Sequence, residues 1–495
     1  KVRLPLSVVF RVPNIRGLAE YIKEAAKGEY VSIKSAGGPG FYAISSIQER
    51  LFILNEIEGI ETAYNLRNIT QVEGQLDYRR LQETFIQLVQ RHESLRTSFT
   101  LREDMINQVV HDTADFKIEH YELTGKSDWK PGVKYPGIDE IIGKFVRPFD
   151  LSRPPLLRVG LIKTAADAAA HILMIDIHHI IADGTSVTIL LREFLDLYEG
   201  KELLPLKIHY KDYSEWLALP EQQAVLKKQE DYWLRLFKGG VPRLENFIDY
   251  VRPPVQDFAG DRINMEFDKN LTSRVNQMAR VSGATLYMVL LAIYNTLLFK
   301  YTGREDMVIG TPTAGRVHND IENVIGLFIN VLVMRNFPAG NKTFAQFLHE
   351  VKANTTAAYE NRDYPFGDLM EKLGIKNDVS RNPIYDLELV LQNMEFPQLK
   401  TKNLTFSPYP FETNTAQVDA ALYVVEQQEK LHFFLIYSTG LFKRETMERF
   451  IAHFKETTLQ VVENKDIKLQ DIVISHDLDK AQAGVYEEMA GDLDF

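Results

Sequence analysis

The stretch Val281–Phe299 constrains the fold most, because it runs for 19 residues without a charged side chain. A stretch of this kind is buried either in lipid or in a protein core. Small and polar residues lie near both of its ends, so its apolar centre covers only Leu286–Ile293. This short centre favours a buried core helix over Leu286–Lys300 and not a membrane span. A helix over Leu271–Val281 is predicted before it and a strand over Met307–Gly310 after it.

The composition agrees with a large protein core. The chain has 495 residues, of which 45% are hydrophobic and 25% charged, values typical of globular proteins with several domains. It has no Cys, which excludes disulfides, thiolate metal sites and a cysteine nucleophile, and favours a cytoplasmic location. The net charge of -11 disfavours a nucleic-acid or anionic membrane surface. No signal peptide is expected in Lys1–Tyr30, because prolines and charges interrupt it.

The pattern of apolar, charged and small residues divides the chain into five parts. Residues 1–25 contain one short amphipathic helix, and residues 26–40 form a linker that ends in Gly and Pro. Residues 41–216 mix helix and strand segments, and residues 217–476 repeat this mixture. We therefore expect an α/β protein with two lobes. Residues 477–495 are acidic and are predicted to form a second linker.

The segment His171–Ser186 is the most informative about chemistry. We predict a strand over His171–Ile181, in which alternation places His179 on an aliphatic face and His178 on the opposite face. The two imidazoles then point apart, which disfavours a shared metal site. Burial beside aliphatic side chains favours the neutral form of His179, which can accept a proton.

A tight turn at Asp183-Gly184 follows this strand, and Thr185 or Ser186 is predicted to cap a helix that runs through Leu197. Two interpretations of the strand-end histidine stay open on the residues alone. It is either a core histidine bonded to backbone groups or a reactive group at a lobe junction, where pockets form.

Other motifs give little support for a particular chemistry. The sequence has no signature of phosphoryl transfer, dinucleotide binding, α/β-hydrolase or zincin chemistry. The pairs His92-Glu93 and His349-Glu350 are isolated, and we interpret both as solvated pairs on helix surfaces.

Seven separated segments, in order, resemble the motifs of one family, the condensation domains of nonribosomal peptide synthetases. The segments are Ser45–Leu54, Arg91–Phe99, His178–Gly184, Tyr210–Trp216, Ile325–Arg335, Arg362–Phe366 and Asn377–Ile384. The third is the family's active-site motif, His-His-x-x-x-Asp-Gly. The resemblance spans about residues 41–475, and its departures at Ile47, Gly367 and Asn377 concern local contacts and not the chemistry.

The resemblance implies an α/β fold like that of chloramphenicol acetyltransferase, with two lobes in a V and a tunnel between them. It implies that upstream and downstream carrier domains present thioesters on 4'-phosphopantetheine arms from opposite ends of the tunnel. The amine of the downstream aminoacyl group would attack the upstream, L-configured aminoacyl or peptidyl thioester. The condensation domain itself would bind no cofactor and no metal.

The resemblance also assigns roles to individual residues. His179 would be the catalytic residue, as general base or as an orienting hydrogen-bond partner, and Asp183 would be structural, paired with Arg316 of the other lobe. The other residues that match motif positions are His178, Gly184, Arg91, Arg96, Asn330, Ser380 and Arg381. Residues 1–25 resemble the end of a carrier domain without its phosphopantetheine serine, and residues 477–495 would lead to an adenylation domain. Two alternatives stay open, an epimerization domain and a non-catalytic platform that recruits carriers.

Overall fold

The structure, a computed structural model, describes most of the chain. The described residues are 8, 12, 14–24, 32–38, 40–56, 62–123, 133–164, 170–244, 247–375, 378–392, 400–411 and 415–474. The second predicted linker, residues 477–495, therefore lies outside the described residues, as do Asn377 and much of the predicted carrier fragment and first linker. The short helix expected in that fragment is present as α2 (Ile15–Glu24).

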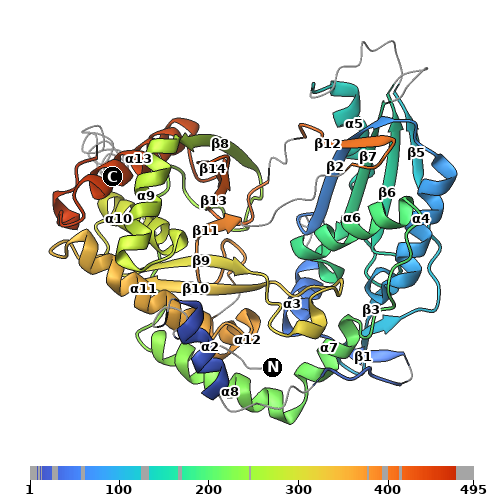
Figure 1. The fold of residues 1–495 in the computed structure, drawn as a ribbon, viewed down its shortest axis with the longest axis horizontal. Helices are drawn as coiled ribbons and strands as arrows, with labels where there is room; N and C mark the ends of the chain where they lie inside the picture. The colour runs from blue at the N-terminus through green and yellow to red at the C-terminus, as the bar shows by residue number, and fades with distance from the viewer. Residues whose placement is uncertain are drawn as a thin grey trace, which may run out of the picture.

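The N-terminal lobe is built on a five-stranded sheet. Its strand order is β12 (Leu404–Pro408), β2 (Asn65–Gly74), β7 (Ala170–His178), β6 (Leu157–Lys163) and β5 (Glu119–Glu122). Helices α4 (Tyr78–Arg91) and α6 (Gly184–Tyr198) cover one face, where the rings of Phe85 and Phe194 lie 5.1 Å apart. Helix α5 (Pro136–Phe145) covers the other face (Figure 1).

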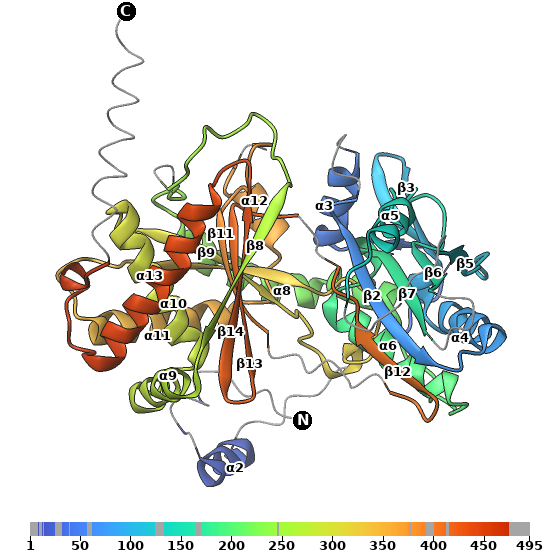
Figure 2. The same ribbon diagram turned by 90° about the horizontal axis from the view of Figure 1, so that it is seen from above.

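The C-terminal lobe is built on a six-stranded mixed sheet. Its strand order is β10 (Asn330–Asn336), β9 (Met307–Thr313), β11 (Leu387–Gln392), β13 (Ala420–Gln427), β14 (Lys430–Ser438) and β8 (Gly260–Phe267). One face carries α9 (Lys269–Ser282), α10 (Leu286–Thr302), α11 (Phe344–Glu360) and α13 (Arg444–Glu463). The other face turns toward the N-terminal lobe (Figures 1 and 2). The two α/β lobes form the V that the resemblance implied.

Helix α10 is the centre of the C-terminal core. Nearly all of its side chains are buried in one apolar cluster with the sheet and the neighbouring helices, so the predicted core helix is confirmed. Over the described residues, no single helix is long and apolar enough to cross a membrane. Helices α9 and α10 pass that test only as a pair bent by 104°.

Shorter elements connect the two lobes and extend the N-terminal one. A three-stranded sheet is formed by β1 (Phe41–Ala43), β4 (Met105–Val110) and β3 (Thr97–Arg102). The connecting helices are α3 (Ser46–Asn55), α7 (Tyr210–Leu217), α8 (Pro220–Leu236) and α12 (Phe366–Lys372), with 3-10 turns η1 (Glu93–Arg96), η2 (His179–Ile181), η3 (Asn319–Ile321) and η4 (Leu469–Asp471). Helix α3 begins at a capping box in which Ser45 and Gln48 bond each other's backbone amides, a strong helix start.

Two segments cross between lobes in a way that a division at residue 216 did not anticipate. Strand β12 follows the C-terminal lobe's β11 in sequence but pairs antiparallel with β2 of the N-terminal lobe. Apolar side chains within residues 321–328, which follow β9, are buried in the N-terminal core. Sequence distance does not predict such exchanges, because each segment only needs an apolar surface that tertiary folding brings near.

The predicted strand over His171–Ile181 is too long. Strand β7 ends at His178, and His179 begins the turn η2. The turn forms because the His178 Nδ1 atom accepts a hydrogen bond from the Ile180 amide at 3.1 Å. The helix cap was also misplaced by sequence, because Asp183 and not Thr185 or Ser186 caps α6.

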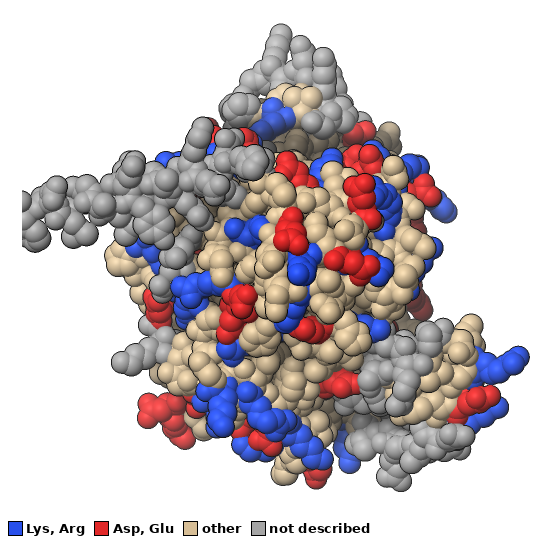
Figure 3. Space-filling view, turned by 90° about the vertical axis from the view of Figure 1, so that its left-hand side faces the viewer, with Lys and Arg blue, Asp and Glu red and all other residues tan. Residues whose placement is uncertain are grey.

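The outer surface of the C-terminal lobe carries charges of both signs. Figure 3 shows this face, with Lys and Arg interspersed among Asp and Glu and no broad field of one sign. Interspersed charges of this kind keep a surface solvated without creating a long-range potential.

Candidate functional site

The site forms where β7 ends and the chain turns into α6. The His179 amide donates to the Tyr64 carbonyl oxygen at 2.8 Å, and Gln48 Nε2 donates to the Ile180 carbonyl oxygen at 3.1 Å. Helix α3 and the start of β2 therefore hold η2 from both sides. These contacts fix where the backbone of His179 leaves the sheet.

Asp183 connects this turn to the C-terminal lobe. One carboxylate oxygen accepts from the Ser186 amide at 2.7 Å and faces Arg316 Nη2 at 3.2 Å. The other accepts from the Phe328 amide at 3.1 Å. Asp183 is 2% exposed, so the expected pair with Arg316 is present and buried.

Arg316 is bonded by more than this carboxylate. Its Nη1 donates to the carbonyl oxygens of Ile321 and Val324, at 2.6 and 2.7 Å, and its guanidinium lies 4.3 Å from the centre of the Phe328 ring. These contacts close the loop between β9 and β10 on itself and hold it against the N-terminal lobe. Replacing Arg316 by a neutral residue would therefore remove the bonds that close the loop and those that hold it against the N-terminal lobe.

Sequence analysis missed the role of Ser186. Its hydroxyl donates to the Gly326 carbonyl oxygen at 2.8 Å and accepts from the Gly326 amide and from Arg316. Gly326 lies so close to the Tyr210 ring that a Cβ atom there would come within 1.9 Å of it. Residues in or next to the third, fourth and fifth motifs thus meet at one lobe junction. Their close contacts there account for a small glycine at position 326 and an aromatic ring at position 210.

The two histidines of the motif are both held neutral by burial. Desolvation lowers the pKa of His178 to about 3, with smaller effects from His179 and Arg158. Desolvation also lowers the pKa of His179, against opposition from the Asp183 carboxylate and nearby backbone groups. His179 as a whole residue is half-buried, while its Nδ1 atom is buried without a hydrogen-bond partner among the described residues, so its imidazole is a desolvated base.

A pocket of about 510 Å³ opens between the lobes. From the N-terminal lobe it is lined by Ser46, Glu49, Arg50, Ile53, Leu54 and Tyr64, and from the other lobe chiefly by α12, residues 378–383 and Val255–Phe258. The carbonyl oxygen of Tyr64 accepts the hydrogen bond from the His179 amide. Tyr64 therefore links the pocket to the turn that carries His179, while His179 itself does not line the pocket.

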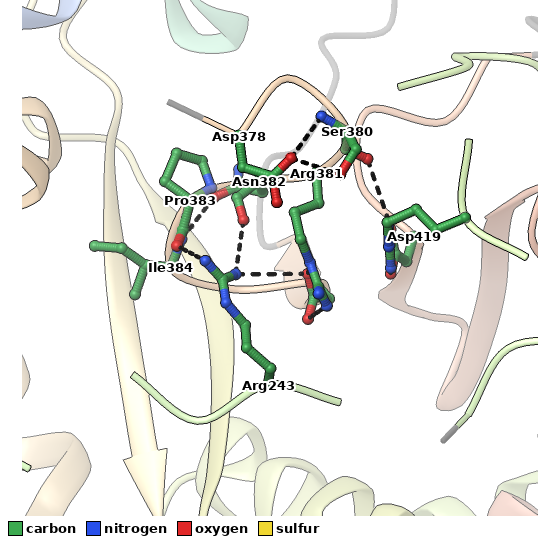
Figure 4. Close-up of polar contacts among 10 residues, drawn as sticks. Arg243, Asp378, Ser380, Arg381, Asn382, Pro383, Ile384 and Asp419 are labelled. Atoms are coloured by element: carbon green, nitrogen blue, oxygen red, sulfur yellow. Dashed lines mark hydrogen bonds and ion pairs between the residues drawn. The ribbon is translucent and has the colours of Figure 1, made fainter. Parts of the chain in front are cut away.

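An ion-pair network shapes the pocket wall on the C-terminal side (Figure 4). Arg381 binds both carboxylate oxygens of Asp386, at 2.9 and 2.6 Å, and Arg243 donates to the carbonyl oxygens of Asn382 and Pro383. The Ser380 hydroxyl donates to Asp378 at 2.6 Å. The seventh motif therefore places Ser380 and Arg381 in the loop that borders the pocket, away from the histidine turn.

Asn330 organises the sixth motif. Its side-chain amide donates to the carbonyl oxygens of Arg362 and Tyr364, and its oxygen accepts from the Phe366 amide at 3.0 Å. These three hydrogen bonds fix the start of α12, which lines the pocket.

Arg91 and Arg96 lie elsewhere in the N-terminal lobe and are not brought to the histidine turn. Arg91 and His92 both bond Glu193 of α6, at 2.9 and 2.7 Å, and Arg96 donates to the His111 carbonyl oxygen. His92 is 1% exposed, so the interpretation of His92-Glu93 as a solvated pair is wrong. The pair lies at the α4–η1 corner, where the chain turns into the lobe.

This arrangement defines a class of protein: a two-lobed acyltransferase fold of the chloramphenicol acetyltransferase kind, with a desolvated histidine at the lobe junction. The model of the family "Condensation domain" matches residues 39–483. The chain belongs to the condensation-domain family of nonribosomal peptide synthetases.

Curated relatives agree with this membership. The chain is 43% identical to bacitracin synthase 3 of Bacillus licheniformis over 95% of its length, and 43% identical to gramicidin S synthase 2 of Brevibacillus brevis over 95%. It is 42% identical to tyrocidine synthase 3 of Brevibacillus parabrevis over 97%. The matched region spans only 7%, 10% and 7% of these synthases, so the chain corresponds to a small part of each.

Solved structures share the fold. The X-domain in its complex with OxyB from teicoplanin biosynthesis matches 91% of this chain and 100% of that chain, with a TM-score of 0.80 at 21% identity. The four-domain nonribosomal peptide synthetase AB3403, bound to AMP and glycine, matches 93% of this chain and 35% of that chain, with a TM-score of 0.78 at 20% identity.

Proposed function

We propose that this chain joins two carrier-bound acyl groups, with His179 as the general base that takes a proton from the attacking amine or as the hydrogen-bond partner that orients it. The amine nitrogen bonds to the thioester carbonyl carbon, the C–S bond breaks, and the proton released from nitrogen balances the proton taken up by the departing thiolate. The observation that carries this proposal is the desolvated imidazole of His179 at the lobe junction, where Tyr64 connects its turn to the inter-lobe pocket.

Positioning supplies much of the rate in this proposal. A thioester is already activated, so holding amine and carbonyl together in a water-poor space between lobes lowers the remaining barrier. A neutral imidazole accepts a proton or a hydrogen bond from the amine, whereas an imidazolium does neither. The lowered pKa of His179 keeps that neutral form populated at physiological pH.

Partners follow from the same proposal. An upstream and a downstream carrier domain would bring the two thioesters on phosphopantetheine arms, and the upstream acyl group would be L-configured. An adenylation domain would follow in the same synthetase. Residues 1–25 support this order, because they resemble the end of a carrier domain directly before the condensation domain.

Single-turnover intact mass spectrometry tests the proposal. The protein is mixed with an upstream carrier loaded with an L-aminoacyl donor, or its D-epimer, and a downstream carrier loaded with an acceptor. Mass should move from the first carrier to the second, preferentially with the L-donor, and His179→Ala should slow transfer by about 100-fold or more. The matched control is His349→Ala, because His349 is exposed on α11.

Two results would overturn the proposal. Acyl groups that stay on their carriers across several donor and acceptor pairs would favour a recruiting platform. Deuterium uptake from solvent at the donor α-carbon, without transfer, would favour an epimerization domain.

A further inference from the structure

Glu388 is a carboxylate on the inter-lobe face of the C-terminal sheet. Its neighbours on β11, Leu387 and Leu389, are buried in the core with the helices. Successive side chains of a strand point to opposite faces, so Glu388 points away from those helices. That face turns toward the N-terminal lobe (Figure 2).

The residues beside Glu388 are small or aromatic. Its register partners are Gly310 on β9 and Ala421 on β13. The Tyr385 ring covers Gly310 so closely that a Cβ atom there would lie 2.5 Å from it. Tyr385 also hydrogen bonds the Glu388 carboxyl. The carboxyl therefore lies over small residues and beside one hydroxyl.

Glu388 has no cationic partner in the described part of the chain. Burial raises its pKa to about 7, and the hydrogen bond from Tyr385 only partly opposes this effect. The residue as a whole is nevertheless half-buried and not fully enclosed. A desolvated carboxyl without a counter-charge destabilises a fold, and such groups concentrate at functional sites.

Glu388 is connected to the inter-lobe pocket through Tyr385. Pro383, two residues before Tyr385, lines the pocket. Arg50 and Tyr64, which line the pocket from the N-terminal lobe, both act electrostatically on the Tyr385 hydroxyl. Phe366, at the start of α12, packs edge to face against the Tyr385 ring at 5.6 Å. A substrate group that reaches past Tyr385 would meet the carboxyl.

We propose that Glu388 is a specificity-determining residue that binds the cationic side chain of an aminoacyl group held between the lobes. The inference rests on the proposed function, because it needs an aminoacyl substrate in this space. An ammonium or guanidinium would supply the counter-charge that no described residue supplies, and its bond to the carboxylate would be strong because water is largely excluded.

Binding is measured first, because it does not require catalysis. Isothermal titration calorimetry compares lysyl-aminopantetheine with norleucyl-aminopantetheine, stable amides whose side chains differ in the terminal ammonium. The wild type should bind the lysyl compound at least about tenfold more tightly than the norleucyl compound, as expected for a charge-assisted hydrogen bond. Glu388→Gln and Glu388→Met should bring the ratio near one, whereas Glu426→Gln, at the exposed end of β13, should preserve it.

Turnover with lysyl and norleucyl groups on the upstream or the downstream carrier then identifies which substrate Glu388 contacts. Glu388 contacts the substrate of the carrier for which the wild type prefers the lysyl group and Glu388→Gln does not. Equal binding of both amides by the wild type, or an unchanged ratio in both Glu388 variants, would overturn the inference. A Glu388-dependent binding preference without any peptide formation would support the inference and count against the proposed function instead.

Discussion

Arg316 and Asp183 form a buried ion pair across the two lobes, with Nη2 and Oδ1 3.2 Å apart and both side chains less than a tenth exposed. The pair closes a network that includes the cap of α6, the Phe328 amide and two carbonyl oxygens of the segment between β9 and β10. The turn that carries His179 is therefore anchored by residues of the other lobe. Its geometry depends on how the lobes meet.

Replacing Arg316 should destabilise the whole protein. Arg316→Ala leaves the Asp183 carboxylate without a cation, and we expect a loss of about 3–5 kcal/mol in the free energy of unfolding. Chemical denaturation measures it. The control is Arg192→Ala, which removes an exposed inter-lobe hydrogen bond to Asn323 and should cost below about 1 kcal/mol. Equal losses in the two variants would contradict the role given to the buried pair.

Acid should destabilise the fold through His178. Its pKa is about 3 in the folded protein, while the unfolded chain binds a proton near pH 6.5. Stability is then fully present above about pH 6.5 and falls by up to about 1.4 kcal/mol per pH unit as the pH drops toward 3. His178→Asn should reduce this slope, because Asn still accepts the Ile180 amide but does not titrate.

Unfolding measured from pH 4.5 to 8 checks this prediction. His349→Asn, on the exposed face of α11, is the control and should leave the slope unchanged. A His178→Asn profile parallel to that of the wild type would show that the acid sensitivity arises elsewhere.

Lys should not be able to replace the bidentate contact that Arg381 makes with Asp386. Arg381 bonds both oxygens of Asp386, and Lys offers a single point charge that cannot reproduce this geometry. We expect Arg381→Lys to lower the free energy of unfolding by about 1–3 kcal/mol. The control Arg444→Lys changes an exposed pair with Asp261 and Glu448 and should cost below about 1 kcal/mol. A smaller loss at Arg381 than at Arg444 would contradict the prediction.

Glu388 should make stability change with pH in the opposite direction. Its folded pKa of about 7 lies above the usual value near 4.5, so the native state holds the proton more tightly than the unfolded chain. Stability therefore falls as the pH rises from about 4.5 to about 7. Glu388→Gln should remove this fall and raise the free energy of unfolding by about 1–3 kcal/mol at pH 8 relative to pH 4.

The difference between the wild-type and Glu388→Gln unfolding curves isolates this effect from that of His178. Glu426→Gln, exposed on β13, provides the baseline. A difference curve that is flat from pH 4 to pH 8 would show that the Glu388 carboxyl is not desolvated.

Several elements could be predicted from sequence because local pattern and burial agree there. The uncharged apolar run of α10 favours a protein core, and α9 and β9 begin and end within a few residues of the expected ranges. The end of β7 could not be predicted in this way. Continuing apolar residues favoured a strand, but a hydrogen bond from the Ile180 amide to the His178 ring ended it.

Local sequence patterns were enough to predict the α/β class and the core helix, and the ordered motifs were enough to predict the family. Three features depended on tertiary packing. Strand β12 and residues 321–328 complete the opposite lobe, His92 is buried against Glu193, and Glu388 faces the space between the lobes without a counter-charge among the described residues. The physical reason is that propensity and periodicity act within one segment. Burial, desolvation and charge pairing depend on which distant segments pack together, and this cannot be seen directly in the amino-acid sequence.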